Sequence, residues 1–465
     1  MAQARSAAQS PEAARVQVIA PAHLGETAVA ALRARGIDAR IADAPGDDIV
    51  AWAIETPPTA TATIELARAC ARAAAAGRPV CLLVPPPRGH GRAAIERAAA
   101  LAYLRSHGAA LGHDVDAWLE AVVVLVRFGM PKGPHTAVIA PAGSWLEAQA
   151  NVIVAEAEAA GVRPPHVGKH EEATDVVLYD PALGLPPSHL PGLHLAVIAR
   201  AELADGDHAT LYGARAAIGA IAVLGRAAER IAVGLGPAPA QASAELEINH
   251  EQRDRQLAQL APGRAGDHPT KTLLRAYGAP ITRQVVAGTP SAAVNAARRI
   301  VFPVEIKPWG NDLPSEPDGC PVERDVTSDA LVRRAFAAVL AAAGRTQNDV
   351  QAVIVRERPP LGRPLAVSFL KLPALGWTVV LDGPQIAAAP APLRLVDAQA
   401  LAAAVVASRA DDPEPDRAGL ANLLRRVSHL VVDLGDRLVR VELPRVIVGG
   451  RGARSVIVDA WCELA

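Results

Sequence analysis

The sequence predicts an α/β protein in which two doubly wound domains are followed by an α+β domain. Short apolar runs alternate with Ala-rich helical stretches over the first half of the 465 residues, which is the pattern of a parallel sheet. These runs lack polar alternation, as expected of strands that helices cover on both faces. In the second half the expected strands outnumber the helices and lie closer together, which favours a largely antiparallel sheet.

The first predicted domain covers residues 14–131, and we expect residues 1–13 before it to be disordered. We expect strands at residues 15–20, 37–42, 49–54 and 79–84 and helices at residues 24–35, 61–75, 93–106 and 114–128. Residues 85–91, Pro-Pro-Pro-Arg-Gly-His-Gly, end the fourth strand, because Pro and Gly interrupt regular structure. Strands and helices in this order predict a doubly wound sheet.

The second predicted domain covers residues 132–235 and repeats the pattern on a smaller scale. We expect strands at residues 136–140, 175–180 and 193–198 and helices at residues 146–160 and 212–230. Residues 234–246 are rich in Pro, Gly and small side chains, which is the composition of a linker. We therefore place a linker at residues 236–264.

The third predicted domain covers residues 265–465. We expect strands at residues 282–286, 301–307, 350–356, 365–369, 377–381, 437–443 and 455–458 and helices at residues 269–277, 290–299, 328–342 and 417–433. Strands that follow one another this closely leave little room for helical crossovers, so their sheet is expected to be antiparallel.

The composition excludes several classes of function. The 47 Lys and Arg residues are balanced by 48 Asp and Glu residues, so no global charge favours nucleic acid. The longest apolar runs, such as residues 121–126 and 216–224, are far shorter than the roughly 20 residues of a membrane span. The four cysteines show no paired spacing and the N-terminus has no apolar signal segment, so we expect a cytoplasmic protein with reduced thiols. We also expect the protein to be an oligomer.

Residues 270–307 resemble the opening of an ATP-grasp domain, in particular that of the NDP-forming acyl-CoA synthetases, the family of ADP-forming acetate–CoA ligase. A helix that ends in Tyr-Gly-Ala-Pro (277–280), a small-residue helix and Phe-Pro-Val-Glu-Ile-Lys (302–307) follow in the family's order. Residues 15–37 and 132–150 resemble the starts of the family's two succinyl-CoA-ligase-like flavodoxin domains. The resemblance implies two flavodoxin-like domains and an ATP-grasp-like domain, with ATP and Mg²⁺ as cofactors and CoA as a substrate.

Members of this family carry a catalytic His in a loop after the strand that corresponds to residues 79–84. His90 is the residue of this chain that could take that role, because it precedes a predicted helix whose N-terminus can bind phosphate oxygens. The alternative interpretation of His90 is a solvent-exposed loop residue. His107 is a further candidate, but it falls at the end of a predicted helix. The family also begins with a CoA-binding domain, which we expect a protein partner to supply here.

Lys307 matches the Lys that contacts nucleotide phosphates in the family, where an ammonium group supplies a point charge. A surface Lys at a strand end is the alternative interpretation. The segment that would cover the phosphates, residues 309–321, contains acidic residues and Pro in place of the family's donors. On the adenine side, Arg356, Glu357 and Arg358 replace the usual Gln-Pro-Met, which makes Arg356 and Glu357 candidates for nucleotide binding.

The family's metal ligands are also changed. Pro364 stands where the family has a Glu, and Leu443 stands where it has an Asn. Mg²⁺ requires oxygen ligands, which Leu and Pro side chains lack. Glu442 could replace the Asn only if the strand shifted its register by one residue, which would turn its side chain to the other face. Asp459 keeps a family-like position and is the candidate metal ligand.

These observations leave two main interpretations of function. The one we favour is a divergent family member, degenerate at its phosphoryl-transfer and metal sites, that acts as a non-catalytic or regulatory subunit. The alternative is an active acid–CoA ligase, which forms acyl-CoA from a carboxylic acid, CoA and ATP through a phosphohistidine, with the CoA-binding domain on a partner chain. An unrelated ATP-grasp ligase that joins a carboxylate to an amine would need the same ATP and Mg²⁺ groups.

Overall fold

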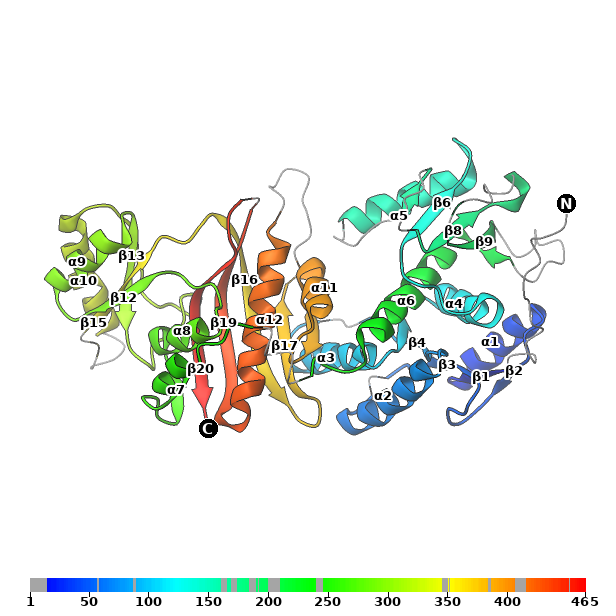
Figure 1. Cartoon of the computed structure of the whole chain (residues 1–465), viewed down its shortest axis with the longest axis horizontal. Helices are drawn as coiled ribbons and strands as arrows, with labels where there is room; N and C mark the ends of the chain where they lie inside the picture. The colour runs from blue at the N-terminus through cyan, green and yellow to red at the C-terminus, as the bar shows by residue number, and fades with distance from the viewer. Residues whose placement is uncertain are drawn as a thin grey trace. The chain divides into compact units, whose positions relative to one another are not determined.

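The computed structural model consists of two compact units (Figure 1). The first contains residues 1–88 and 100–236, and the second contains residues 89–99 and 237–465. The structure describes residues 15–56, 58–86, 89–159, 165–168, 174–183, 190, 192–199, 210–239, 246–344, 350, 352–383, 386–405, 415–450 and 452–465. The expected disordered N-terminus, residues 1–13, lies outside the described residues.

The first unit begins with a five-stranded parallel sheet in the order β2-β1-β3-β4-β5. Its strands are β1 (Val16–Ile19), β2 (Ala39–Ile41), β3 (Ile49–Ala53), β4 (Cys81–Leu83) and β5 (Ala110–Gly112). The helices of this part of the chain are α1 (Ala22–Ala34), α2 (Ala60–Ala75), α3 (Arg92–Ser106), of which residues 92–99 belong to the second unit, and α4 (Val115–Phe128). Side chains start two of these helices: Thr59 caps α2 and Asp114 caps α4, each accepting a hydrogen bond from a backbone amide of the first turn.

A second five-stranded parallel sheet follows in the order β10-β9-β8-β6-β7. Its strands are β6 (Thr136–Ile139), β7 (His166–Val167), β8 (Val176–Tyr179), β9 (Leu193–Ile198) and β10 (Leu211–Tyr212). Its helices are α5 (Trp145–Ala159), α6 (Ala214–Val233) and the 3₁₀ turn η1 (Pro181–Leu183). Numbered within itself, each sheet has the order 2-1-3-4-5 of flavodoxin-like folds.

The two parallel sheets share one apolar core. Helices α4 and α6 contact each other, and buried side chains of both sheets, such as Val18 and Val138, belong to the same cluster. A buried ion pair accompanies this core: the Arg35 guanidinium lies 2.5 Å from the Glu120 carboxylate and stacks on the Tyr212 ring. The first unit therefore contains two flavodoxin-like sheets packed through shared helices.

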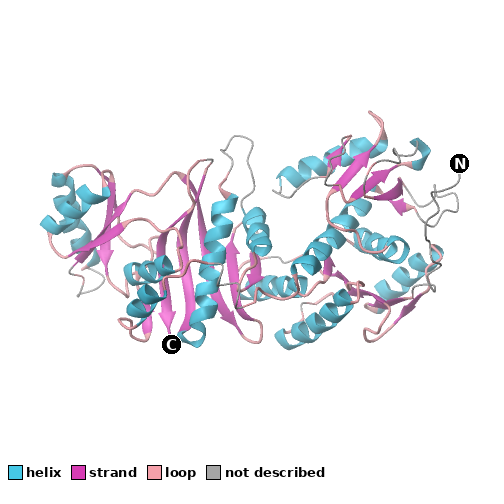
Figure 2. Cartoon of the chain, in the orientation of Figure 1, coloured by secondary structure: helices cyan, strands magenta, loops and turns pink. Residues whose placement is uncertain are grey.

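The second unit contains two antiparallel sheets (Figure 2). The six-stranded sheet has the order β11-β20-β19-β16-β17-β18, with β11 (Gly263–Ala265), β16 (Gly362–Leu372), β17 (Gly376–Asp382), β18 (Ala387–Pro390), β19 (Leu438–Gly449) and β20 (Val456–Leu464). The four-stranded sheet has the order β12-β15-β13-β14, with β12 (Gln284–Ala287), β13 (Val304–Trp309), β14 (Glu323–Val326) and β15 (Ala352–Glu357).

Helices pack on both of these sheets. Helices α9 (Pro290–Ile300) and α10 (Asp329–Ala343) cover the four-stranded sheet, as Figure 1 shows. The larger sheet packs against α8 (Asp267–Ala276), α11 (Leu395–Val405) and α12 (Arg417–Leu434). Helix α7 (His250–Leu257) contacts α8, and η4 (Gly435–Arg437) follows α12.

The predicted fold class is confirmed: parallel flavodoxin-like sheets precede an antiparallel α+β region. The positions of the domain boundaries stay a prediction. Residues 236–264, where we expected a linker, include helix α7 and most of strand β11. Leu257 of α7 belongs to the apolar core of the second unit, so this part of the range is folded with that unit. None of the described helices is long and apolar enough to cross a membrane.

Candidate functional site

The candidate site lies in the second unit, where strand β13 of the small sheet meets β20 of the large sheet and the start of α8. Val304 and Ile306 of β13 are buried in the core beneath α9 and α10. Because side chains alternate along a strand, Glu305 and Lys307 face the opposite side of the sheet. Arg356 of β15 lies directly opposite Glu305 in the antiparallel ladder, so the two side chains meet across the strands.

Lys307 is almost completely buried and lies among carboxylates. Its Nζ atom is 2.7 Å from Oδ1 of Asp459 on β20 and 3.4 Å from Oδ2 of Asp267, the first residue of α8. A third carboxylate, that of Glu316, lies 4.0 Å away. Burial alone would lower the pKa of Lys307, but Asp267 and Asp459 overcome that effect and raise the pKa above its ordinary value. Lys307 is therefore a charged, internally paired ammonium group.

Arg356 is fully buried and holds two carboxylates together. Its Nε atom donates to Glu305 Oε2 at 2.9 Å, and its Nη1 atom donates to the Val458 carbonyl at 3.0 Å. Nη1 also forms an ion pair with Glu316. Burial opposes the charged form, but Glu316 and Glu305 overcome it and raise the pKa of Arg356 above its usual value. This guanidinium is permanently charged and uses its donors inside the protein.

Glu316 reaches this place from an irregular segment, residues 310–322, that connects β13 to β14. Its side chain is only 2% exposed and contacts Arg356 and Lys307, while Arg445 of β19 lies 2.6 Å from Oε2. Burial would raise the pKa of Glu316, but Arg356 and the other cations hold it at about 2. Its backbone amide also donates to Asp459 Oδ2 at 2.9 Å.

Lys271 of α8 extends the site on its other side. Its Nζ atom lies 3.1 Å from Asp267 Oδ1 and donates to Gln284 and to the carbonyl of Val458. Burial lowers the pKa of Lys271 to about 8, although Asp267 opposes the shift. Burial would raise the pKa of Asp267, but Lys271 and Lys307 overcome it and lower that pKa.

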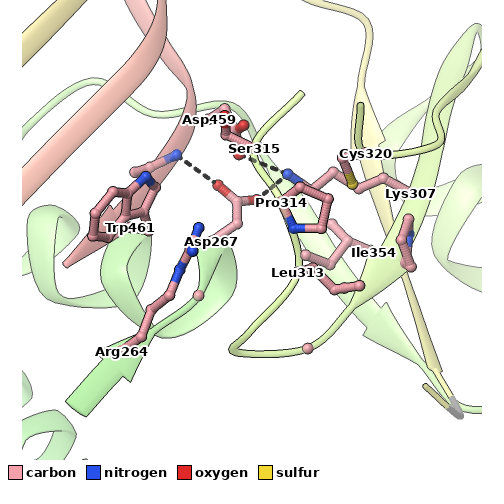
Figure 3. Close-up of a pocket in the computed structure, with 14 residues that line it drawn as sticks. Arg264, Asp267, Lys307, Leu313, Pro314, Ser315, Cys320, Ile354, Asp459 and Trp461 are labelled. Atoms are coloured by element: carbon pink, nitrogen blue, oxygen red, sulfur yellow. Dashed lines mark hydrogen bonds and ion pairs between the residues drawn. The ribbon is translucent and has the colours of Figure 1, made fainter. Parts of the chain in front are cut away.

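We call this set of four cations and four carboxylates the charge network; its members are Lys271, Lys307, Arg356, Arg445, Asp267, Glu305, Glu316 and Asp459. These eight side chains together are formally neutral, and the half-exposed Arg324 of β14 adds a fifth cation, 3.3 Å from Glu316 and 3.8 Å from Glu305. Figure 3 shows Asp267, Lys307 and Asp459 around a small cavity beside it. The cavity has a volume of about 20 Å³, which is room for about one water molecule.

The structure brings three of the five predicted site residues together: Lys307, Arg356 and Asp459. Glu357 lies outside the network, because its carboxylate instead accepts hydrogen bonds from Arg283 and Arg454.

His90 is exposed in the loop before α3, which places the predicted catalytic residue outside the charge network. His107 is half-buried, with Nδ1 2.8 Å from the Tyr103 carbonyl.

The residues at the expected metal positions contact protein groups and do not converge on a common point. Leu443 is fully buried in the apolar core of the large sheet. Glu442 accepts a hydrogen bond from Ser368 at 2.6 Å, and burial raises its pKa despite that bond. Asp459 uses Oδ1 on Lys307 and Oδ2 on the amide of Glu316. Within the described ranges, no three His, Cys, Asp or Glu side chains converge as a metal site would require.

Five members of the charge network were not identified from the sequence: Asp267, Lys271, Glu305, Glu316 and Arg445. Polar–apolar alternation along residues 304–307 could have placed Glu305 beside Lys307. Glu316 carries no such signal, because it belongs to an irregular segment whose path no periodicity reveals.

This arrangement does not fit Mg²⁺-ATP. Nucleotide phosphates need cations that are free to accept them, but each cation of the network already contacts a carboxylate. Mg²⁺ needs several oxygen ligands in octahedral geometry, but both oxygens of Asp459 are occupied. A cavity of about 20 Å³ is also far too small for a nucleotide, since ligand pockets are typically about 300–1,000 Å³.

Comparison with known proteins gives the family of this region. Residues 263–464 match the family model of an ATP-grasp domain. The chain is 25% identical over 219 residues to acetate–CoA ligase (ADP-forming) II subunit beta of Pyrococcus furiosus, a match that covers 43% of this chain and 92% of that protein. It is 27% identical over 111 residues to 4-hydroxybutyrate–CoA ligase (ADP-forming) of Nitrosopumilus maritimus, covering 23% of this chain and 16% of that protein.

Solved structures also resemble part of the chain. One is the dinucleotide-forming acetyl-coenzyme A synthetase 1 of Candidatus Korarchaeum cryptofilum in complex with coenzyme A and Ca-AMPCP, at 24% identity and a TM-score of 0.42. The match covers 46% of this chain and 100% of the synthetase chain. A Pyrococcus horikoshii protein matches at 22% identity and a TM-score of 0.43, covering 46% of this chain and 98% of that chain.

Proposed function

We propose that this chain, which matches the NDP-forming acyl-CoA synthetase family through its ATP-grasp domain at residues 263–464, acts as a non-catalytic or regulatory subunit of an acyl-CoA synthetase. The observation that carries the proposal is the pairing of Lys307. Its ammonium group contacts Asp459, Asp267 and Glu316, so its charge is already paired inside the protein and is not free to receive a polyphosphate.

The metal positions support the same proposal. Leu443 is buried in the apolar core and cannot provide an oxygen ligand, and Pro364 lies near the start of strand β16 opposite Ile447. Asp459 is held by a cation and a backbone amide. A Mg²⁺ ion at this place would have to break the contact with Lys307, and the ammonium would then repel the metal.

A protein partner is part of the proposal. The Pyrococcus furiosus relative is named a beta subunit, and the match covers 92% of it. We propose that this chain also assembles with another chain, and that the partner supplies a CoA-binding domain. In such an assembly CoA would be bound by the partner.

The active-ligase alternative requires His90 to accept a phosphoryl group. His90 is exposed in a loop before α3, which leaves its ring accessible to a donor. The alternative further requires that the ATP-grasp domain bind Mg²⁺-ATP, and the charge network opposes that step. The two functions are therefore separated by whether ATP phosphorylates the protein.

The test is incubation of the purified chain with Mg²⁺ and ATP labelled at the γ-phosphate, followed by measurement of acid-labile, base-stable label. We expect no phosphohistidine in the wild type. His90→Ala and His107→Ala serve as matched variants. Label that is present in the wild type and in His107→Ala but lost in His90→Ala would overturn the proposal and establish the ligase mechanism.

A further inference from the structure

We propose that residues 310–322 form a strap that holds an anion-binding site closed, with the Glu316 carboxylate in the place of a phosphate group. The inference rests on the proposed function, because it concerns the same site, and it adds a mechanism for how the site is kept shut. The strap is defined by its ends: it follows β13 (Val304–Trp309) and precedes β14 (Glu323–Val326).

Glu316 is the carboxylate of the network that a local movement can remove. The other three are fixed by regular structure: Asp267 on α8, Glu305 on β13 and Asp459 on β20. Strand and helix hydrogen bonds hold those three backbones in place. The strap has no helix or strand of its own, so its central part can move without breaking a sheet.

A few local bonds hold the strap down. The Glu316 amide donates to Asp459 at 2.9 Å, while the bond from the Cys320 amide to the Ser315 carbonyl, 3.1 Å, closes a turn within the strap. Gly266, at the start of α8, donates to the Asn311 side chain at 3.2 Å. The main electrostatic hold is the contact of Glu316 with Arg356 and Arg445, to which the half-exposed Arg324 adds a third cation. The strap can therefore open chiefly when another anion takes the place of the Glu316 carboxylate among these cations.

Removing Glu316 would leave a positive site. Five cations, the half-exposed Arg324 among them, would then face three carboxylates. Arg445 would lose the ion-pair partner that the described residues provide for it, and Arg356 would keep only Glu305. Two guanidinium groups that both contact one carboxylate provide the geometry that also binds phosphate oxygens.

The ligand class that fits is a phosphate-bearing anion bound without a metal. Cations, rather than carboxylates, would line the vacated place, so the charge of a phosphate would be neutralised by protein groups directly. An inorganic polyphosphate tests this chemistry without the base and ribose of a nucleotide. The strap then competes with the phosphate for Arg356, Arg445 and Lys307.

The experiment is calorimetric titration of tripolyphosphate in EDTA into the full chain, with wild type, Glu316→Gln and Glu323→Gln. Gln keeps the size and hydrogen-bonding oxygen of Glu316 but removes its charge. Glu323 is the matched control, an exposed carboxylate directly after the strap. We expect Glu316→Gln to bind roughly tenfold more tightly than the wild type, which corresponds to about 1.4 kcal/mol, because the competing charge is removed. Glu323→Gln should match the wild type.

A charge-restoring variant sharpens the result. In Glu316→Gln/Arg445→Gln the network has its wild-type net charge again, so the gain in affinity should disappear. Equal affinity of Glu316→Gln and Glu323→Gln would overturn the strap, and so would a gain that survives the second substitution.

If Glu316→Gln does not fold, hydrogen exchange of the wild type decides instead. Tripolyphosphate should then speed exchange at the amides of Glu316 and Cys320, and unchanged exchange at a saturating concentration would contradict the inference. These outcomes are distinguishable from failure of the proposed function, which is decided by phosphohistidine.

Discussion

Two buried carboxylates, one in each unit, show how the number of nearby cations decides the behaviour of an acid. Glu120 in the first unit has one cationic partner, Arg35, and both side chains are less than a tenth exposed. Burial outweighs the attraction of Arg35 and raises the pKa of Glu120. Glu316 in the second unit is at least as well buried, yet the cations around it hold its pKa at about 2.

The comparison shows that a buried carboxylate with one cationic partner and one with several play different parts in the structure. A single buried pair gains little over its desolvation, and one of its members keeps a tendency to become neutral. A carboxylate shared by Arg356, Arg445 and Lys307 stays ionised and fixes the segment that carries it. The first arrangement accompanies an apolar core, whereas the second closes a site.

The largest expected effect comes from removing the central cation of the network. Arg356→Met leaves Glu305 and Glu316 buried without their main partner, and breaking such a pair typically costs about 3–5 kcal/mol. The measurement is the free energy of unfolding of the second unit in urea, followed by hydrogen exchange at β13 and β15. Arg358→Met is the control, since Arg358 is half exposed and pairs with Asp325 at the surface; its cost should be at most about 1 kcal/mol. Similar costs for the two variants would show that the network is not the stabilising feature.

The pH dependence of Glu316 is expected to be the next largest effect. Its folded pKa of about 2 lies below the ordinary value of 4.5, so its contribution to stability is present above pH 4.5 and is lost as the pH falls towards 2. The loss is on the order of 3 kcal/mol. The stability difference between wild type and Glu316→Gln should therefore shrink on acidification over this window, as measured by urea unfolding at each pH. A constant difference would contradict the assigned ionisation.

The smallest effect is expected at the single pair of the first unit. Arg35→Met should cost about 1–3 kcal/mol at pH 7, because Glu120 can respond by taking up a proton. The folded pKa of Glu120 is raised, so protonation favours the folded state and the cost should fall as the pH is lowered from 7 to 5. Urea unfolding of Arg35→Met and wild type at the two pH values measures this. A cost of Arg35→Met that grows on acidification would contradict the raised pKa of Glu120, and with it the contrast with Glu316.

The sequence was sufficient for the architecture because its signals are periodic. Continuous apolar runs such as residues 79–84 predicted buried parallel strands, and the dense strands after residue 280 predicted an antiparallel sheet. Short or polar elements gave no such signal. Strands β7 and β10 have two residues each, and helix α7, of sequence His-Glu-Gln-Arg-Asp-Arg-Gln-Leu, lacks an apolar stripe.

The site could be predicted only where a residue is part of a regular element with a family-like position. Lys307, Arg356 and Asp459 were found in this way, and the structure places all three in one network. That they pair with one another could not be predicted, because the contact between Lys307 and Asp459 joins residues 152 positions apart in the sequence. Glu316 in particular depends on the path of an irregular segment, which only the three-dimensional structure provides.

The central claim is that the charge network leaves no place for Mg²⁺-ATP, and thermal unfolding tests it most directly. A ligand that binds the folded state raises the melting temperature according to its concentration and affinity. We predict that ATP changes the melting temperature of the wild-type chain little, and by the same amount with Mg²⁺ or with EDTA. A clear rise that requires Mg²⁺ and disappears in Asp459→Ala would contradict the account, because it would show that Asp459 holds a metal beside a bound nucleotide.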